Sequence, residues 1–105
     1  MVYFIISINI ENKKNRKDYD DYIAKVKPII EKYGGRYVIR SENVTALSDK
    51  WNPDRVIIIE WRNKEQLFKC LNSEEYAAIK HKRENNVESR AVIAEDYYEN
   101  TSDKN

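Results

Sequence analysis

The chain opens with an alternation of apolar and polar positions. Within residues 2–10 every even-numbered position is apolar, whereas the odd-numbered positions are mixed. The mixed positions are Tyr3, Ile5, Ser7 and Asn9. A period of two is typical of a β-strand, so this segment is predicted to be a strand with one strongly buried face and one mixed face.

After a polar turn, apolar residues recur every three or four positions, which is the period of an amphipathic helix. These residues are Tyr19, Tyr22, Ile23, Val26, Ile29, Ile30 and Tyr33. Asn15 is a suitable N-cap, and Asp18 falls in the first turn, where a negative charge is favourable. Pro28 interrupts the pattern, but burial of large side chains at about 1.5–3 kcal/mol each is expected to outweigh its penalty of about 3 kcal/mol.

Both glycines of the chain follow this helix side by side. Because the apolar stripe ends at Tyr33, Gly34 is predicted to close the helix in the left-handed conformation that glycine adopts most easily. Gly35 is then expected to let the chain turn back sharply into a strand over RYVIRS. In a regular strand Arg36 and Arg40 would lie on the same face.

A long loop and a strongly apolar strand come next. The loop between Ser41 and Asp54 is longer than most connections within a compact domain, and such loops tend to be functional or disordered. It carries Trp51, which a disordered loop would seldom need. The run RVIIIEW at 55–61 is apolar on both faces in its middle, which indicates a central strand.

Two helical segments and a last strand complete the pattern. Asn63 and Ser73 are suitable caps for a short helix and for the segment EEYAAIKHKR. The last strand is predicted around residues 91–94. We expect one domain over residues 1–96 and a polar, mobile tail over residues 97–105.

The order of these elements, β-α-β-β-α-β, is that of the ferredoxin-like fold of the α+β class. In this fold a four-stranded antiparallel sheet carries both helices on one face. The other face would then expose Tyr3, Ile5, Val56 and Ile58, with Ala91 and Ile93 or their neighbours beside them. Because an apolar surface of this extent is rarely left bare, we expect a homodimer packed sheet to sheet.

Composition excludes several classes of function. The 105 residues include 19 basic and 18 acidic side chains, so no general field attracts nucleic acid or an anionic membrane. RNA-recognition motifs share this element order, but their central strand carries aromatic residues that stack bases, whereas RVIIIEW offers aliphatic ones. No segment has the roughly 18 apolar residues of a membrane span, and MVYFIISINI lacks the features of a signal peptide, so a cytoplasmic location is expected.

Three motifs carry a resemblance to a known family. They are YGGR, WNPDR leading into VIIIEW, and SEEY with an arginine seven residues after its tyrosine. Together they resemble the domain of unknown function 1330 family of the dimeric α/β-barrel superfamily, from residue 3 to about 96. Similar barrels include cofactor-free monooxygenases and small-molecule isomerases. By this likeness the family positions fall on Tyr22, Gly34, Gly35, Arg36, Arg40, Tyr76 and Arg83.

Two arginine sites are the leading candidates for ligand binding. Arg36 and Arg40, with Trp51 folded over them, would hold a carboxylate by forked hydrogen bonds, or they would merely protect an edge strand by charge. Tyr76 and Arg83 lie about two turns apart on one helix face, where they would frame the mouth of a pocket. The alternative for Arg83 is a solvated helix face.

Three other reactive side chains have simpler explanations. His81 is a possible general base, but it stands among cations in KHKR and is expected at the surface. Glu60 would either have a raised pKa suited to acid-base work or meet an arginine across the dimer interface. Cys70 is expected to be a small core residue. A single cysteine and a single histidine exclude an internal disulfide and paired-histidine metal sites.

The sequence therefore predicts a homodimer that binds a small molecule in each subunit, without a metal or other cofactor. It would act either as a cofactor-free enzyme on a small organic acid or aromatic compound, or as a non-catalytic interaction or ligand-sensing module. The residues expected at the pocket are Tyr22, Trp51, Trp61 and Tyr76, with Arg36, Arg40 or Arg83 for polarity.

Overall fold

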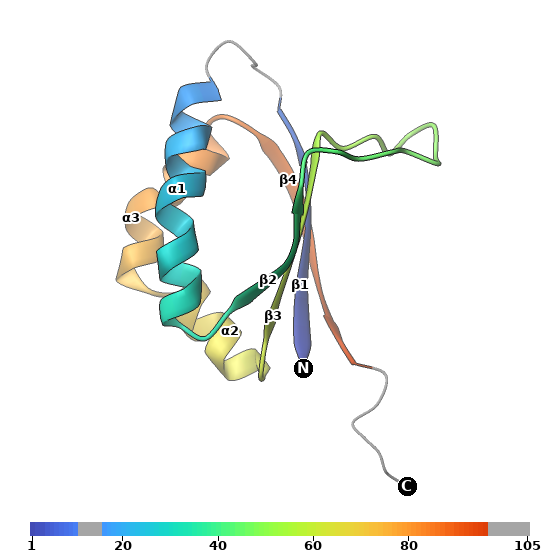
Figure 1. Cartoon of the computed structure of the whole chain (residues 1–105). Helices are drawn as coiled ribbons and strands as arrows, with labels where there is room; N and C mark the ends of the chain where they lie inside the picture. Colours follow the sequence, from blue (N-terminus) through green and yellow to red (C-terminus); the bar gives the residue numbers. More distant parts are fainter. Residues whose placement is uncertain (11–15, 97–105) are drawn as a thin grey trace, which may run out of the picture.

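The computed structural model describes residues 1–10 and 16–96. Its elements are β1 (Val2–Asn9), α1 (Arg16–Lys32), β2 (Arg36–Ser41), β3 (Arg55–Trp61), α2 (Lys64–Leu71), α3 (Glu74–Glu84) and β4 (Glu88–Glu95). The helices all lie on one side of the antiparallel sheet (Figure 1). The predicted ferredoxin-like fold is confirmed, with the second helical region divided into α2 and α3. The expected N-cap Asn15 and the predicted tail 97–105 lie outside the described residues.

The strand order is β2-β3-β1-β4, which places β1 and β3 in the centre of the sheet. Both strands carry apolar residues on the side of the helices, and they carry several on the other side as well. In the register, Phe4 of β1 stands opposite Ile59 and Ile93, and these side chains point toward the helices. The next residue, Ile5, stands opposite Ile58 and Val92 on the face that no described helix covers, which we call the open face.

The register also decides which residues of β4 lie on the open face. Of the expected positions, Ala91 and Ile93 point toward the helices, because they pair with Ile6 and Phe4. Their neighbours take the open face instead, and these are Arg90, Val92 and Ala94.

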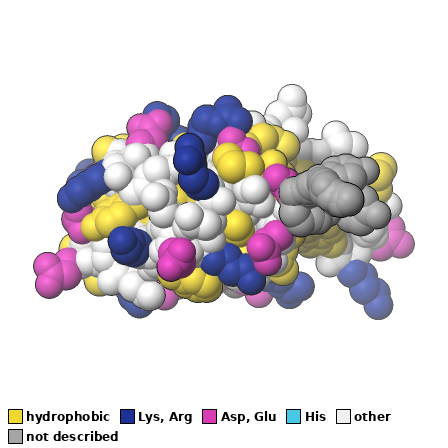
Figure 2. Space-filling model, turned by 90° about the horizontal axis from the view of Figure 1, so that it is seen from below, with side chains coloured by type: hydrophobic (Ala, Val, Ile, Leu, Met, Phe, Trp, Pro, Cys, Tyr) yellow, Lys and Arg dark blue, Asp and Glu magenta, His cyan; other side chains and the backbone are white. Residues whose placement is uncertain are grey.

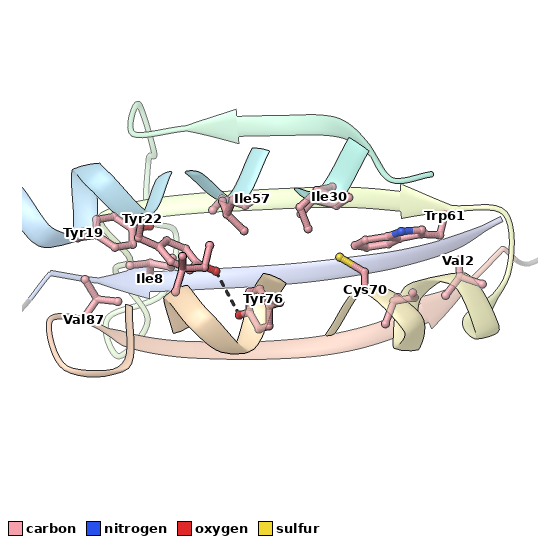
Figure 3. Close-up of a cluster of buried hydrophobic side chains, with 14 of the residues drawn as sticks. Val2, Ile8, Tyr19, Tyr22, Ile30, Ile57, Trp61, Cys70, Tyr76 and Val87 are labelled. Carbon is pink, nitrogen blue, oxygen red and sulfur yellow. Dashed lines mark hydrogen bonds between the residues drawn. The ribbon is translucent and has the colours of Figure 1, made fainter. Parts of the chain in front are cut away.

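The hydrophobic core fills the space between the sheet and the helices. From α1 it receives Tyr19, Tyr22, Val26 and Ile30, four members of the predicted stripe. Trp61 of β3 and Leu67 and Cys70 of α2 are 0% exposed. Figure 3 shows Trp61 and Cys70 toward one end of this core, and Tyr22 and Tyr76 away from them.

The two glycines have different roles at the end of α1. Gly34 has a φ of 87°, its N–H donates to the carbonyl of Glu31 at 3.1 Å, and the N–H of Gly35 donates to that of Ile30 at 2.9 Å. This is a Schellman cap, so the predicted left-handed role of Gly34 is confirmed. A Cβ atom at Gly35 would lie 2.6 Å from Ile30 Cγ2 and 2.8 Å from Trp61 Cε2. Gly35 is therefore required mainly because the chain passes close to the core.

A β-bulge in β2 overturns one prediction from the sequence. The pairing between β2 and β3 shifts by one residue between Tyr37 and Ile39. One extra residue reverses the alternation of faces beyond it. Arg36 consequently pairs with Glu60 on the open face, whereas Arg40 stands opposite Ile57 on the helix side. The two arginines do not share a face.

Salt bridges and hydrogen bonds join the end of α1 to the start of α3. The ammonium group of Lys32 forms an ion pair with Glu75, and the hydroxyl of Tyr33 donates to the Glu75 carboxylate at 2.8 Å. Hydrogen bonds from Lys32 first, and then from Tyr33, lower the pKa of Glu75 from 4.5 to about 2.

Replacing Glu75 by glutamine is expected to lower the free energy of unfolding near neutral pH. Because its folded-state pKa is depressed, the carboxylate stabilises the fold fully above about pH 4.5, and this contribution is lost as the pH falls through about 2. Urea unfolding over this pH range should show the difference from the wild type shrinking with acidity. Glu74→Gln in the same turn is the control, and equal losses in both variants would count against the network.

None of the helices within residues 1–10 and 16–96 has the length and apolarity needed to cross a membrane. On the side of the molecule seen in Figure 2, basic and acidic side chains are interspersed and form no area of a single sign. This distribution agrees with the nearly equal numbers of the two charges.

Candidate functional site

A cavity of about 120 Å³ lies between the sheet and the helices. Most of its wall is apolar and comes from both layers, including Phe4, Ile6, Val26, Ile57, Ile59 and Leu71. Its polar side chains are Tyr22, Tyr37, Tyr76, Arg83 and Ser89. Such a mixture, with few polar groups on an apolar wall, is typical of small-molecule sites.

Tyr22 and Tyr76 meet because α1 and α3 pack against each other. Their hydroxyl oxygens are 3.1 Å apart and hydrogen-bonded, as the dashed line in Figure 3 shows. The two rings form an edge contact with centroids 6.4 Å apart. Ser73 fixes the start of α3, since its hydroxyl oxygen accepts from the N–H of Tyr76 at 3.1 Å. Both tyrosines are therefore held by buried, regular structure.

Arg83 lies on α3 two turns after Tyr76 and reaches β4. Its Nη1 atom donates to the hydroxyl of Ser89 at 2.6 Å. Its Nη2 atom lies 3.7 Å from Glu84, whose side chain is 51% exposed. The Nε atom is buried and has no acceptor among residues 1–10 and 16–96. One N–H group of this guanidinium thus lacks a partner.

The electrostatics of the cluster favour hydrogen-bond donation. Burial raises the pKa of Tyr22, and the phenol of Tyr76 raises it further, so Tyr22 stays protonated at neutral pH. Burial opposes the charge of Arg83, but the two phenol oxygens more than offset this and its pKa is raised. Burial also raises the pKa of Tyr37 to about 12. The polar part of the cavity presents O–H groups and a cation.

The cavity wall offers little for proton abstraction. Among the described residues that line it, none is a carboxylate, an imidazole or a thiol. In the same part of the chain, no group of three or more His, Cys, Asp or Glu side chains is placed to hold a metal ion. The arrangement is suited to binding a negatively charged oxygen, through donors that are already in position.

The structure brings three of the seven residues predicted for the pocket together, namely Tyr22, Tyr76 and Arg83. Trp61 is 0% exposed and packs in the core with its ring centroid 6.3 Å from that of Phe4. Arg40 lies over the ring of Tyr37 at 5.2 Å, on the helix side but not among the residues that line the cavity.

The other two predicted residues, Arg36 and Trp51, lie on the open face. Arg36 donates through Nε to Glu60 at 2.6 Å. Trp51 donates through Nε1 to the hydroxyl of Ser7 at 3.4 Å, so it covers the sheet on the side away from the cavity. The loop that carries Trp51 extends away from the sheet opposite the helices (Figure 1). The prediction of a pocket that combines Trp51 with Tyr22 and Tyr76 is therefore wrong.

Two of the three remaining reactive side chains lie where the simpler prediction from the sequence placed them, and the third has a different partner. Glu60 is buried and meets Arg36 of its own chain, where the sequence allowed an arginine across an interface. His81 is exposed on α3. Cys70 is fully buried, and burial raises the pKa of its thiol to about 11, which suits a core residue.

Sequence reasoning missed Tyr37 and Ser89 as cavity residues. Tyr37 had a usable signal, because it alternates with Arg36 along the strand. The structure pairs it with Ile59 on the helix side. Ser89 had none, since a serine at the start of an edge strand is ordinary and only its bond to Arg83 shows its role.

Solved structures of other proteins share this fold. A protein of unknown function from Rhodopseudomonas palustris has 16% identity and a TM-score of 0.76, over 92% of this chain and 82% of that one. SnoaB, a cofactor-independent oxygenase from Streptomyces nogalater, has 11% identity and a TM-score of 0.64, over 92% and 93%. A dabb family protein with a ferredoxin-like fold from Mesorhizobium loti has 8% identity and a TM-score of 0.64, over 92% and 97%. At these identities the likeness shows the fold alone.

The comparison by sequence is more specific. No curated protein matches the chain significantly. A family profile described as "Domain of unknown function (DUF1330)" matches residues 1–97 of the 105 in the chain. The motifs around Gly34, Trp51 and Tyr76 had indicated the same family. The chain therefore belongs to the DUF1330 family.

Proposed function

We propose that this protein is a homodimer in which each subunit binds a small molecule in the cavity between sheet and helices. The observation that carries the proposal is the cavity itself, with an apolar wall and one polar cluster of Tyr22, Tyr76 and Arg83. Concave apolar sites with a few convergent polar groups are the usual form of small-molecule sites.

The volume of the cavity limits the size of its guest. An engineered apolar cavity of about 150 Å³ holds benzene, so a cavity of about 120 Å³ suits a single ring or a short branched chain. This agrees with the expectation of a small organic acid or aromatic compound. Larger guests would have to extend through the mouth of the cavity.

Binding without catalysis is favoured by the side chains at hand. Tyr22 and Arg83 could stabilise a developing oxyanion, which is a common component of catalysis. The described residues of the cavity wall nevertheless include no general base. A proton would therefore have to be abstracted by a group of the bound ligand itself. A cofactor-free enzyme stays the alternative, with support from the fold shared with SnoaB.

The homodimer is proposed from the open face. Ile39 and Val92 are 43% and 60% exposed there, next to the half-buried Ile5, Val56 and Ile58. A second copy packed on this face would remove a contiguous apolar surface from water and leave the cavity on the other side of the sheet free. We retain the cytoplasmic location predicted from the sequence as part of this proposal.

Filling the cavity tests the proposal. Ala91 lines the cavity from β4, so Ala91→Phe should occupy it and abolish the binding of single-ring compounds such as benzamide and benzoate. Binding is followed by amide chemical shifts in the ¹⁵N spectrum of the full chain. Ala78→Phe, at an exposed position of α3, should bind as the wild type does. Equal binding by both variants, or shifts confined to the open face, would overturn the proposal.

A further inference from the structure

We propose that the guest of the cavity is a small carboxylic acid with an apolar body, whose carboxylate lies against Arg83 and the Tyr22–Tyr76 pair. This inference rests on the proposed function and adds the charge and orientation of the ligand. It follows from hydrogen-bond donors of these side chains that have no acceptor among the described residues.

The first unused capacity is on the arginine. The Arg83 side chain is only 21% exposed, and its nearest carboxylate among the described residues is that of Glu84, which lies at 3.7 Å and is itself half exposed. Its Nη1 atom donates to the neutral hydroxyl of Ser89, and its guanidinium also interacts with the phenol oxygens of the tyrosine pair. Its Nε atom has no acceptor in the described chain. A largely buried cation with a free N–H favours an anionic oxygen, and guanidinium groups bind carboxylates by two parallel hydrogen bonds.

The second unused capacity is on the tyrosine pair. The two phenols have one O–H donor each, and the hydrogen bond between Tyr22 and Tyr76 uses one of these donors. Within residues 1–10 and 16–96 the other hydrogen has no acceptor. Arg83 and the tyrosine pair therefore each keep a donor without an acceptor among the described residues, and all three side chains line the cavity. Both are donors, so the matching ligand group accepts hydrogen bonds without donating any, as a carboxylate does.

The rest of the cavity wall indicates what the remainder of the ligand is like. Beyond the polar cluster the wall is formed by aliphatic and aromatic side chains of the sheet and α1, such as Ile57, Ile59 and Val26. A benzoate ring or a branched chain of about five carbons fits a cavity of about 120 Å³. A strongly hydrated anion without an apolar body would make no contact with these apolar side chains.

Matched pairs of acid and amide test the inference on the full-length protein. Benzoate is compared with benzamide, and 3-methylbutanoate with its amide, in titrations followed by amide chemical shifts. Loss of a hydrogen-bonded charge pair should be worth about tenfold or more in Kd, so each acid should bind at least that much more tightly than its amide. Arg83→Gln should remove the preference for the acid, and Tyr22→Phe should reduce it. Arg62→Gln, at an exposed position between β3 and α2, should leave it unchanged.

The outcomes separate this inference from the proposed function. If acids and amides bind equally well and shift cavity residues, the carboxylate assignment fails while the small-molecule cavity stands. If neither acids nor amides shift cavity residues, both fail. Arg83→Lys controls for folding, since it keeps the charge but loses the planar fork, and it should retain a weaker preference for the acid. Full retention of the preference in Arg83→Gln would overturn the inference.

Discussion

Replacement of Trp61 by alanine is expected to destabilise the protein by about 3–5 kcal/mol, the range found for large aromatic residues removed from a core. Trp61 is 0% exposed at the end of β3. Its indole lies close to Gly35, where any added Cβ would approach Cε2 to 2.8 Å, and in edge contact with Phe4. Removal of the ring would leave a large void where the helix end, the sheet and α2 meet.

The second tryptophan of the chain is the control for this prediction. Trp51 is 55% exposed in the loop before β3, so Trp51→Ala should change the free energy of unfolding by about 0.5 kcal/mol or less. The two variants are compared by urea unfolding followed by far-ultraviolet circular dichroism. Tryptophan fluorescence is not used, because each variant removes one of the two tryptophans. Similar losses of stability would show that the core is not organised around Trp61.

The second large effect is expected on assembly. Val92→Asp should convert the proposed dimer to a monomer, because Val92 is 60% exposed on the open face, opposite Ile5. An unpaired carboxylate buried in an apolar interface is unfavourable by several kcal/mol, which raises the Kd of the dimer by about 100-fold or more. Sedimentation equilibrium over a range of concentrations measures this directly.

The control for assembly is a charge placed on the helix side. Ala24→Asp, at an exposed position of α1, should leave the dimer intact. A wild-type protein that is monomeric at all concentrations would contradict the proposed dimer. So would a dimer that tolerates Val92→Asp and dissociates with Ala24→Asp, because the helices would then form the interface.

The fold was predictable because its signals are periodic. The alternation in β1 and the stripe of α1 specify their faces, and the apolar run of β3 marks a central strand. The bulge in β2 has no such signal, since RYVIRS alternates as a regular strand would. One unpaired residue near Val38 was enough to send Arg36 and Arg40 to opposite faces.

The candidate site was predictable only in part, because it depends on how elements meet. The sequence indicated Tyr22, Tyr76 and Arg83 separately, by helical spacing and by family likeness. Their meeting depends on the packing of α1 against α3, which no local pattern specifies. Trp51 was misplaced for a related reason. A loop has no periodicity, so the side of the sheet on which it folds could not be inferred.

The most direct test of the account is to determine which face of the sheet a guest contacts. Intermolecular nuclear Overhauser effects from the ring protons of bound benzoate to isoleucine and valine methyl groups give this answer. We expect contacts with Ile57 and Ile59, which line the cavity beneath the helices. Contacts with Ile58 and Val92 on the open face would contradict it.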